Sequence, residues 1–135
     1  MAFQYEFTIK LYDTDAAGIL FFGHQFRIVH DAYQAFMEQS GFNFAEILKR
    51  GEILVPIVHA EADYLEPLAV GDELTITMRA TKISEHSFTL GYDLVRPDST
   101  SVGTVQTVHV TVDQASGKKT PLPALLREAL QKVAS

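Results

Sequence analysis

The chain has 135 residues, no cysteine and a formal net charge of −6 at pH 7. The length fits one domain over residues 1–135, and the lack of cysteine excludes disulfides, a thiolate nucleophile and cysteine-ligated zinc. The acidic balance, without any basic run, argues against a nucleic-acid-binding protein. No apolar stretch approaches the ~20 residues of a membrane span, and the N-terminus lacks the features of a signal peptide. We therefore expect a cytoplasmic protein with no membrane partner.

The first predicted element is a strand over residues 3–11, where apolar and polar residues alternate. A loop with Asp13 and Asp15 follows, and its Gly18 suits a turn that needs an unusual backbone angle. The loop leads into a predicted helix. A carboxylate beside a helix N-terminus is suited to chemistry on a carbonyl, because the first N–H groups of a helix are unpaired and the helix dipole favours negative charge there.

A long helix is predicted over residues 24–40. Apolar side chains at steps of three and four place on one face Phe22, Phe26, Val29, Tyr33 and Phe36. Packing in the core is the simplest interpretation of that face. At ~1.5 Å per residue the helix is roughly 25 Å long, enough to cross several strands. Gly41 is placed to end it, and Asn43 with Glu46 predicts the cap of a short helix that ends near Gly51.

Four more strands and a last helix are predicted from alternation and turn residues. The strands cover residues 53–65, 74–81, 88–94 and 102–112, and the helix covers residues 123–134. Pro56 indicates a bulge or an edge position in the first of these strands. In the last strand His109 and Gln106 are expected on opposite faces. One strand, a long helix and four closely linked strands predict an α+β fold in which the sheet covers the helix.

The sequence DTDAAGILFF at residues 13–22 resembles the motif of the hotdog-fold acyl-CoA thioesterases, within the 4-hydroxybenzoyl-CoA thioesterase family. The order of predicted elements is similar over nearly the whole chain. The stretches LVPIVHA at 54–60, QTVHV at 106–110 and KTPLP at 119–123 look like the 1,4-dihydroxy-2-naphthoyl-CoA hydrolases of phylloquinone and menaquinone synthesis. The resemblance implies a hotdog fold, a five-stranded antiparallel sheet wrapped around a long central helix. It also implies a homodimer with paired sheet edges, association into a homotetramer, and an active site between protomers.

By this resemblance Asp15 is the catalytic carboxylate. It would attack the thioester carbonyl directly or act as general base on a water, and the sequence leaves both routes open. Backbone N–H groups near Phe22 and Gly23 would form the oxyanion hole. A turn or cap carboxylate is the alternative role for Asp15. Asp13 is expected to be structural, and Gly18 is expected to bring Asp15 and the helix N-terminus together.

Three histidines are candidates for substrate binding. His30 matches the position at which an acid of the 4-hydroxybenzoyl subgroup meets the ring hydroxyl. Here it would bond a naphthoyl hydroxyl, or it is a half-buried structural histidine. His24 stands where the wider family frequently has asparagine, and His59 is a candidate for lining the acyl pocket.

Lys118 and Lys119 are candidates for holding the CoA phosphates, because the link that is basic in the 4-hydroxybenzoyl relatives carries Glu85 and His86 here. No cofactor is expected. No metal is expected either, because His59 and two carboxylates on one flat strand make a poor cage.

The sequence thus predicts hydrolysis of an aromatic acyl-CoA, with 1,4-dihydroxy-2-naphthoyl-CoA as the first candidate substrate. The alternatives are a thioesterase for 4-hydroxybenzoyl-CoA, for short acyl-CoA or for an acyl carrier protein, and a non-catalytic module that binds acyl groups. A hotdog dehydratase is disfavoured, because the motifs of that site are not found.

Overall fold

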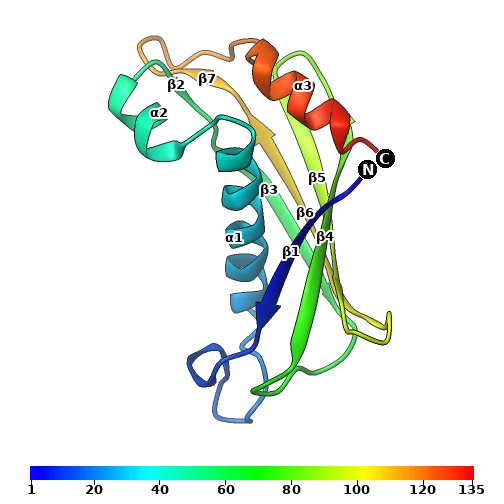
Figure 1. Ribbon diagram of the computed structural model, residues 1–135. Helices are drawn as coiled ribbons and strands as arrows, with labels where there is room; N and C mark the ends of the chain where they lie inside the picture. Colours follow the sequence, from blue (N-terminus) through cyan, green and yellow to red (C-terminus); the bar gives the residue numbers. More distant parts are fainter.

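The computed structural model describes residues 1–135 as an antiparallel sheet with one long helix against one of its faces (Figure 1). The five-stranded sheet has the order β1-β4-β5-β6-β3. Its strands are β1 (Phe3–Thr8), β3 (Ile57–Tyr64), β4 (Glu73–Ile83), β5 (Ser87–Val95) and β6 (Ser101–Val110). The helices are α1 (His24–Gln39), α2 (Phe44–Arg50) and α3 (Ala124–Lys132). A short ribbon pairs β2 (Ile53–Leu54) with β7 (Val112–Asp113). The predicted α+β fold, a five-stranded antiparallel sheet around a long helix, is confirmed.

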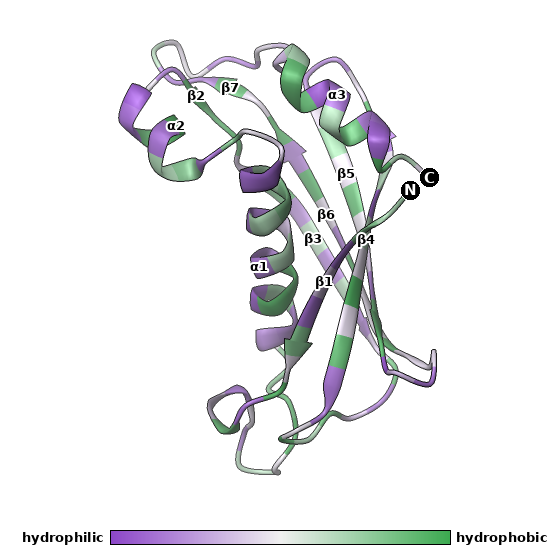
Figure 2. Cartoon of the chain, in the orientation of Figure 1, coloured by the Kyte–Doolittle hydropathy of each residue, from purple (hydrophilic) through white to green (hydrophobic).

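Helix α1 packs on the sheet through one continuous face. Figure 2 shows hydrophobic and hydrophilic residues alternating along the helix, as expected when only one face is buried. Ile28, Ala32 and Met37 on this face are fully buried. The helix ends as predicted, because Gly41 adopts a φ of +89° and lets the Phe42 N–H bond the Met37 carbonyl at 2.7 Å. The buried face fixes which side of α1 remains free for a ligand or a partner.

The cap predicted for the short helix is also present. Asn43 Oδ1 accepts the N–H groups of Ala45 and Glu46 at 2.9 and 3.3 Å, and Gly51 ends α2 with a φ of +65°. Together with α3 and the β2–β7 ribbon, α2 lies at one end of the molecule, whereas the loop before α1 lies at the other (Figure 1).

Strand β6 turns two polar side chains, those of Thr107 and His109, toward the helix. His109 is opposite Phe88 and Thr107 is opposite Leu90 in the register with β5, and directly opposed residues share a face. His109 and Thr107 are therefore buried, while Val108 between them lies on the outer face and is only partly buried. Gln106 lies on the outer face, so it and His109 are on opposite faces, as predicted.

Strand β3 forms a free edge of the sheet. It pairs only with β6, begins after Pro56, and has a register shift between Ile57 and His59, so the bulge and the edge position predicted from Pro56 are both present. Apolar side chains on it are exposed: Ile57 is 44% exposed and Val58 59%. An unpaired strand edge with apolar side chains is a template for pairing with another chain. No helix of the protein has the length and apolar character to cross a membrane.

Candidate active site

The loop between β1 and α1 holds Asp15 in a tight turn. Gly18 has a φ of +79°, in the region that favours glycine, and its N–H donates to the Asp15 carbonyl at 3.0 Å. Asp15 Oδ1 accepts the Ala17 N–H at 2.8 Å. The turn role left open by the sequence is therefore present. It occupies Oδ1 and leaves Oδ2 without a hydrogen-bond partner in the chain.

Asp15 is exposed in the single chain and lines a cavity of ≈ 320 Å³, here named the loop cavity. The rest of its lining comes from the loop, the start of α1 and the segment after β3, namely Ile19, Leu20, Phe22, Gln25, Tyr64, Leu65, Glu66, Pro67 and Leu68. Glu66 pairs with Arg96 at 3.2 Å. The cavity is mainly apolar, and of its two carboxylates only Asp15 has no cationic partner. Asp15 is therefore free to act on a ligand.

Asp13 anchors the loop to α1. Its side chain is fully buried, accepts the Lys10 N–H at 2.7 Å and pairs with Arg27 on the first turns of the helix. Its carbonyl accepts the Phe21 N–H at 3.0 Å. Because Asp13 closes a turn on Lys10, β1 ends at Thr8, earlier than the sequence predicts. Asp13 thus has the structural role expected of it.

The start of α1 offers open backbone donors. No side chain caps the helix at Gly23, and the N–H groups of Phe22 and Gly23 donate to no acceptor in the chain. Phe22 lines the loop cavity with Asp15. Unpaired N–H groups at a helix start, together with the helix dipole, stabilise negative charge on an oxygen atom. The cavity is therefore lined by Asp15, with its free carboxylate oxygen, and by Phe22, one of the two residues at the helix start whose N–H is unpaired.

Gln25 and Tyr64 hold this helix start in place, and the sequence analysis did not find them. Gln25 is 2% exposed, and its amide donates to the carbonyls of Asp63 and Thr104 at 3.0 and 3.2 Å. The Tyr64 hydroxyl donates to the Phe22 carbonyl at 2.7 Å. The sequence signal that could have identified Gln25 is its position on α1, one turn before the apolar residues of the buried helix face.

A second cavity, here named the inner cavity, has a volume of ≈ 300 Å³ and lies between the middle of α1 and strands β3, β5 and β6. Its lining includes Val29, His30, Tyr33, Tyr92, Thr107 and His109. The Thr107 hydroxyl joins two of these groups, at 3.3 Å from the Tyr92 hydroxyl and 2.8 Å from His109 Nε2. Burial, with His30 as a lesser cause, lowers the pKa of His109 to about 4. Polar groups are thus gathered inside an otherwise apolar interior.

The three predicted substrate histidines lie in different places. His30 is exposed and lines the inner cavity, with its ring 5.6 Å from that of Tyr33. His24 begins α1 and packs edge-on against Phe21. His59 lies on the outer face of β3, where its Nε2 is 3.6 Å from Glu61, and it lines neither cavity.

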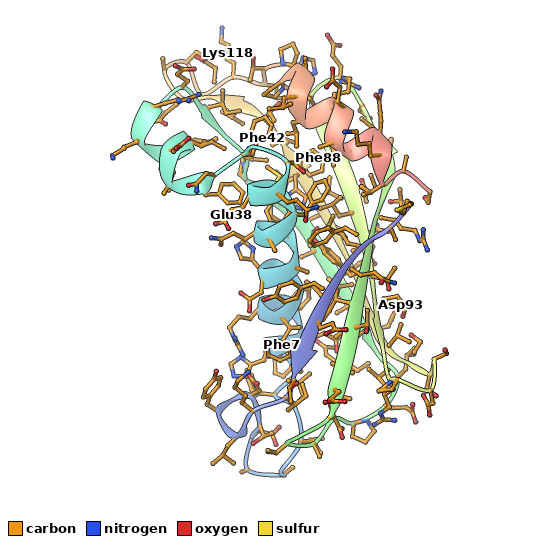
Figure 3. The ribbon with its side chains drawn as sticks, in the orientation of Figure 1. Phe7, Glu38, Phe42, Phe88, Asp93 and Lys118 are labelled. Carbon is orange, nitrogen blue, oxygen red and sulfur yellow. The ribbon has the colours of Figure 1, made fainter.

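The predicted phosphate contacts lie far from Asp15 within one chain. Lys118 and Lys119 follow β7, at the end of the molecule with α2 and α3 (Figure 3), whereas the Asp15 loop is at the opposite end. A single chain therefore does not bring them together. No group of three histidine, aspartate or glutamate side chains converges to hold a metal.

Replacing His109 should change how stability depends on pH. The folded pKa of His109 is about 4, against 6.5 for the free side chain, so between these values only the unfolded chain takes up the proton. The contribution of His109 to stability is fully present above pH 6.5 and is lost as the pH drops toward 4, by roughly 3 kcal/mol at ~1.4 kcal/mol per pH unit. We expect His109→Gln to lose this slope in urea titrations, and His59→Gln on the outer face to retain it. An unchanged slope in His109→Gln would contradict the assignment.

A sheet wrapped on a long helix, with a carboxylate loop at the start of that helix, defines a hotdog-fold thioesterase. The chain belongs to the thioesterase-like superfamily, because the sequence model of that family matches residues 9–130. The predicted family and enzyme class are therefore confirmed.

Several proteins and solved structures are similar to this chain over nearly its whole length. The chain is 36% identical to a 1,4-dihydroxy-2-naphthoyl-CoA hydrolase of Rippkaea orientalis, over 95% of this chain and 94% of that protein. It is 35% identical to the hydrolase of the same name from Synechococcus elongatus, over 96% of this chain and 95% of that one. Its structure matches that of a 1,4-dihydroxy-2-naphthoyl-CoA thioesterase from Synechocystis with a TM-score of 0.93, at 29% identity and 98% coverage of both chains.

Proposed function

We propose that this protein hydrolyses an aromatic acyl-CoA thioester, with 1,4-dihydroxy-2-naphthoyl-CoA as the substrate, in phylloquinone or menaquinone biosynthesis. The observation that carries the proposal is the free Oδ2 of Asp15 in a mainly apolar cavity shared with the open start of α1. The names of full-length relatives at about 35% identity support the same substrate. A cytoplasmic location stays a prediction.

Asp15 would deliver the nucleophile. Its free Oδ2 either attacks the thioester carbonyl, giving a mixed anhydride that water then opens, or takes a proton from a water that attacks the same carbon. In both routes the C–S bond breaks and CoA leaves as a thiolate. A thiolate is a good leaving group, so the site does not need a strong general acid, which fits its few polar side chains.

The N–H groups of Phe22 and Gly23 would receive the oxyanion. They are unpaired within the chain, and Gln25 and Tyr64 hold the backbone around them. Donors that are already fixed in place need no reorganisation as charge develops, and removing one typically costs about 2.7–4 kcal/mol of transition-state stabilisation. The two buried bonds of Gln25 therefore act on catalysis through the position of the helix start.

A second copy of the chain would complete the site. The free edge of β3 carries exposed Ile57 and Val58, and pairing it with the β3 edge of another copy would bury both and extend the sheet. Antiparallel pairing across a two-fold axis sets opposite ends of the two chains side by side. The Lys118–Lys119 end of one copy would then lie nearer the Asp15 loop of the other, where CoA phosphates would bind. Association of two such dimers into a tetramer belongs to the same proposal.

A panel of thioesters tests the function. We expect 1,4-dihydroxy-2-naphthoyl-CoA to be hydrolysed with a kcat/KM about 100-fold above that of butyryl-CoA, and 4-hydroxybenzoyl-CoA to fall between them, because a pocket built for an aryl hydroxyl rejects chains that lack it. Release of CoA is followed with a thiol-reactive dye, which has no background from a chain without cysteine. Preference for a short acyl-CoA or an acyl carrier protein would favour the alternative substrates. Binding without turnover of any thioester would indicate a non-catalytic module.

A further inference from the structure

The inner cavity contains two buried polar atoms that have no partner in the chain. They are the Tyr33 hydroxyl and His109 Nδ1, on side chains that are 2% and 0% exposed. Both residues line the cavity. Buried polar atoms are nearly always hydrogen-bonded, because leaving one unpaired is destabilising. Two such atoms at one cavity indicate that its contents supply the missing bonds.

The rest of the cluster holds these two groups in place. The Tyr92 hydroxyl bonds Thr107, and Thr107 bonds His109 Nε2 at 2.8 Å, while Phe88 stacks on the His109 ring with a 3° angle between the planes. The His109 ring therefore cannot turn to satisfy Nδ1 elsewhere without breaking its bond to Thr107. The Tyr33 ring lies 4.6 Å from the His109 ring, centroid to centroid. The two unpaired atoms thus belong to adjacent, fixed rings.

The charge of the cluster selects a neutral polar ligand. His109 has a pKa of about 4, so it is neutral at pH 7 and carries one donor nitrogen and one acceptor nitrogen. Burial also raises the pKa of Tyr33, which keeps its hydroxyl protonated. A hydroxyl can both donate and accept. Arg27 also lines the cavity, but its exposed side chain is already paired with Asp13, so an anion would meet no buried cation beside Tyr33 and His109.

We propose that the inner cavity is the pocket that selects hydroxylated aromatic acyl groups, and that Tyr33 and His109 bind a phenolic hydroxyl inside it. This rests on the proposed function, to which it adds the pocket and the two residues that recognise the acyl group. A cavity of ~150 Å³ holds benzene in another protein, so ≈ 300 Å³ has room for two fused rings. His30 and Ile57 also line the cavity, and because both are exposed they lie at its entrance. His109 and Tyr33 lie deeper than His30.

A substrate whose acyl group lies in the inner cavity is too short to extend to the Asp15 loop of the same chain. Tyr33 follows Gly23 by ten positions, which is about 15 Å along the helix at ~1.5 Å per residue. That distance exceeds the length of a fused-ring acyl group. An acyl group in the inner cavity therefore has its carbonyl at the Asp15 loop of a neighbouring copy, not at the loop of the same chain.

The test compares two ketones that no hydrolase can cleave, 2-acetylnaphthalene and its 1,4-dihydroxy derivative, by calorimetry on the full-length protein. We expect the dihydroxy ketone to bind at least about tenfold more tightly, and Tyr33→Phe to reduce this preference to less than about threefold. Tyr5→Phe removes a hydroxyl from β1, away from the cavity, and should keep the wild-type preference. Thr107→Val, which releases the bond to His109, supplies a second variant and should also reduce the preference.

The outcomes separate this inference from the proposed function. Equal binding of the two ketones, or an unchanged preference in both cavity variants, would overturn the pocket assignment even if the enzyme hydrolyses aryl-CoA. Conversely, a preference that is lost in Tyr33→Phe would support the pocket even if no thioester were turned over. In the active enzyme the same variant should lower kcat/KM for the dihydroxy substrate more than kcat/KM for 2-naphthoyl-CoA.

Discussion

Asp15→Asn is expected to lower kcat for aryl-CoA hydrolysis by about three orders of magnitude or more, because a carboxamide can neither attack the carbonyl nor take a proton from water. The fold should be retained. Asn has an Oδ1 that can accept the Ala17 N–H in the same way, and the side chain is exposed, so the unfolding free energy should change by less than about 0.5 kcal/mol. Single-turnover rates and a urea titration measure the two effects.

Asp98 offers a matched control for this variant. Its Oδ1 accepts the Thr100 N–H at 2.9 Å, the same local turn that Asp15 makes with Ala17, but it lies in the link between β5 and β6. Asp98→Asn should therefore keep wild-type turnover. If Asp15→Asn also kept it, the carboxylate would have no part in the reaction.

Isotope labelling distinguishes the two routes open to Asp15. When hydrolysis proceeds in H₂¹⁸O, the general-base route places the label only in the released acid. The anhydride route can also place it in the carboxyl group of Asp15, where mass spectrometry of a proteolytic peptide detects it. Label in that peptide of the wild-type protein, and not in the peptide that contains Asp98, would establish direct attack.

The sequence predicted well those features that depend on neighbouring residues. The apolar repeat of α1, the Gly41 stop and the Asn43 cap each act within about one helical turn, so their interpretation did not require the tertiary fold. The DTDAAG loop was found in the same way, since its turn is closed by bonds between residues two to four apart. The assignment of a catalytic role to Asp15 came from the family resemblance, not from the turn itself.

What the sequence could not give depends on how distant strands pair. Alternation in β6 does not say which face meets the helix, and the register with β5 turned Thr107 and His109 inward. After the register shift in β3 the odd-numbered positions from His59 onward face outward, so His59 lines neither cavity and Ala60 lines the inner one. The prediction for Lys118 likewise paired a basic side chain with a phosphate on charge alone, because the sequence does not show how far Lys118 lies from Asp15.

The exposed edge of β3 carries the second prediction with a large expected effect. Val58→Asp should yield a folded monomer whose kcat/KM is lowered by about 100-fold or more, because two charges placed against each other at a paired edge oppose association. Val58 is 59% exposed in the single chain, so the substitution should leave the fold of the monomer intact. Sedimentation measures the assembly state, and CoA release measures the rate.

Val70→Asp provides the comparison, since Val70 is 52% exposed in the turn before β4 and away from the β3 edge. It should retain both assembly and activity. A Val58→Asp monomer with wild-type turnover would mean that one chain contains a complete site, whereas an unchanged assembly would place the interface elsewhere. The distance between the Asp15 loop and Tyr33 on α1 argues for the expected result. An aryl group bound by Tyr33 cannot reach the carboxylate of its own chain, so the loss of pairing should remove the reaction while each chain stays folded.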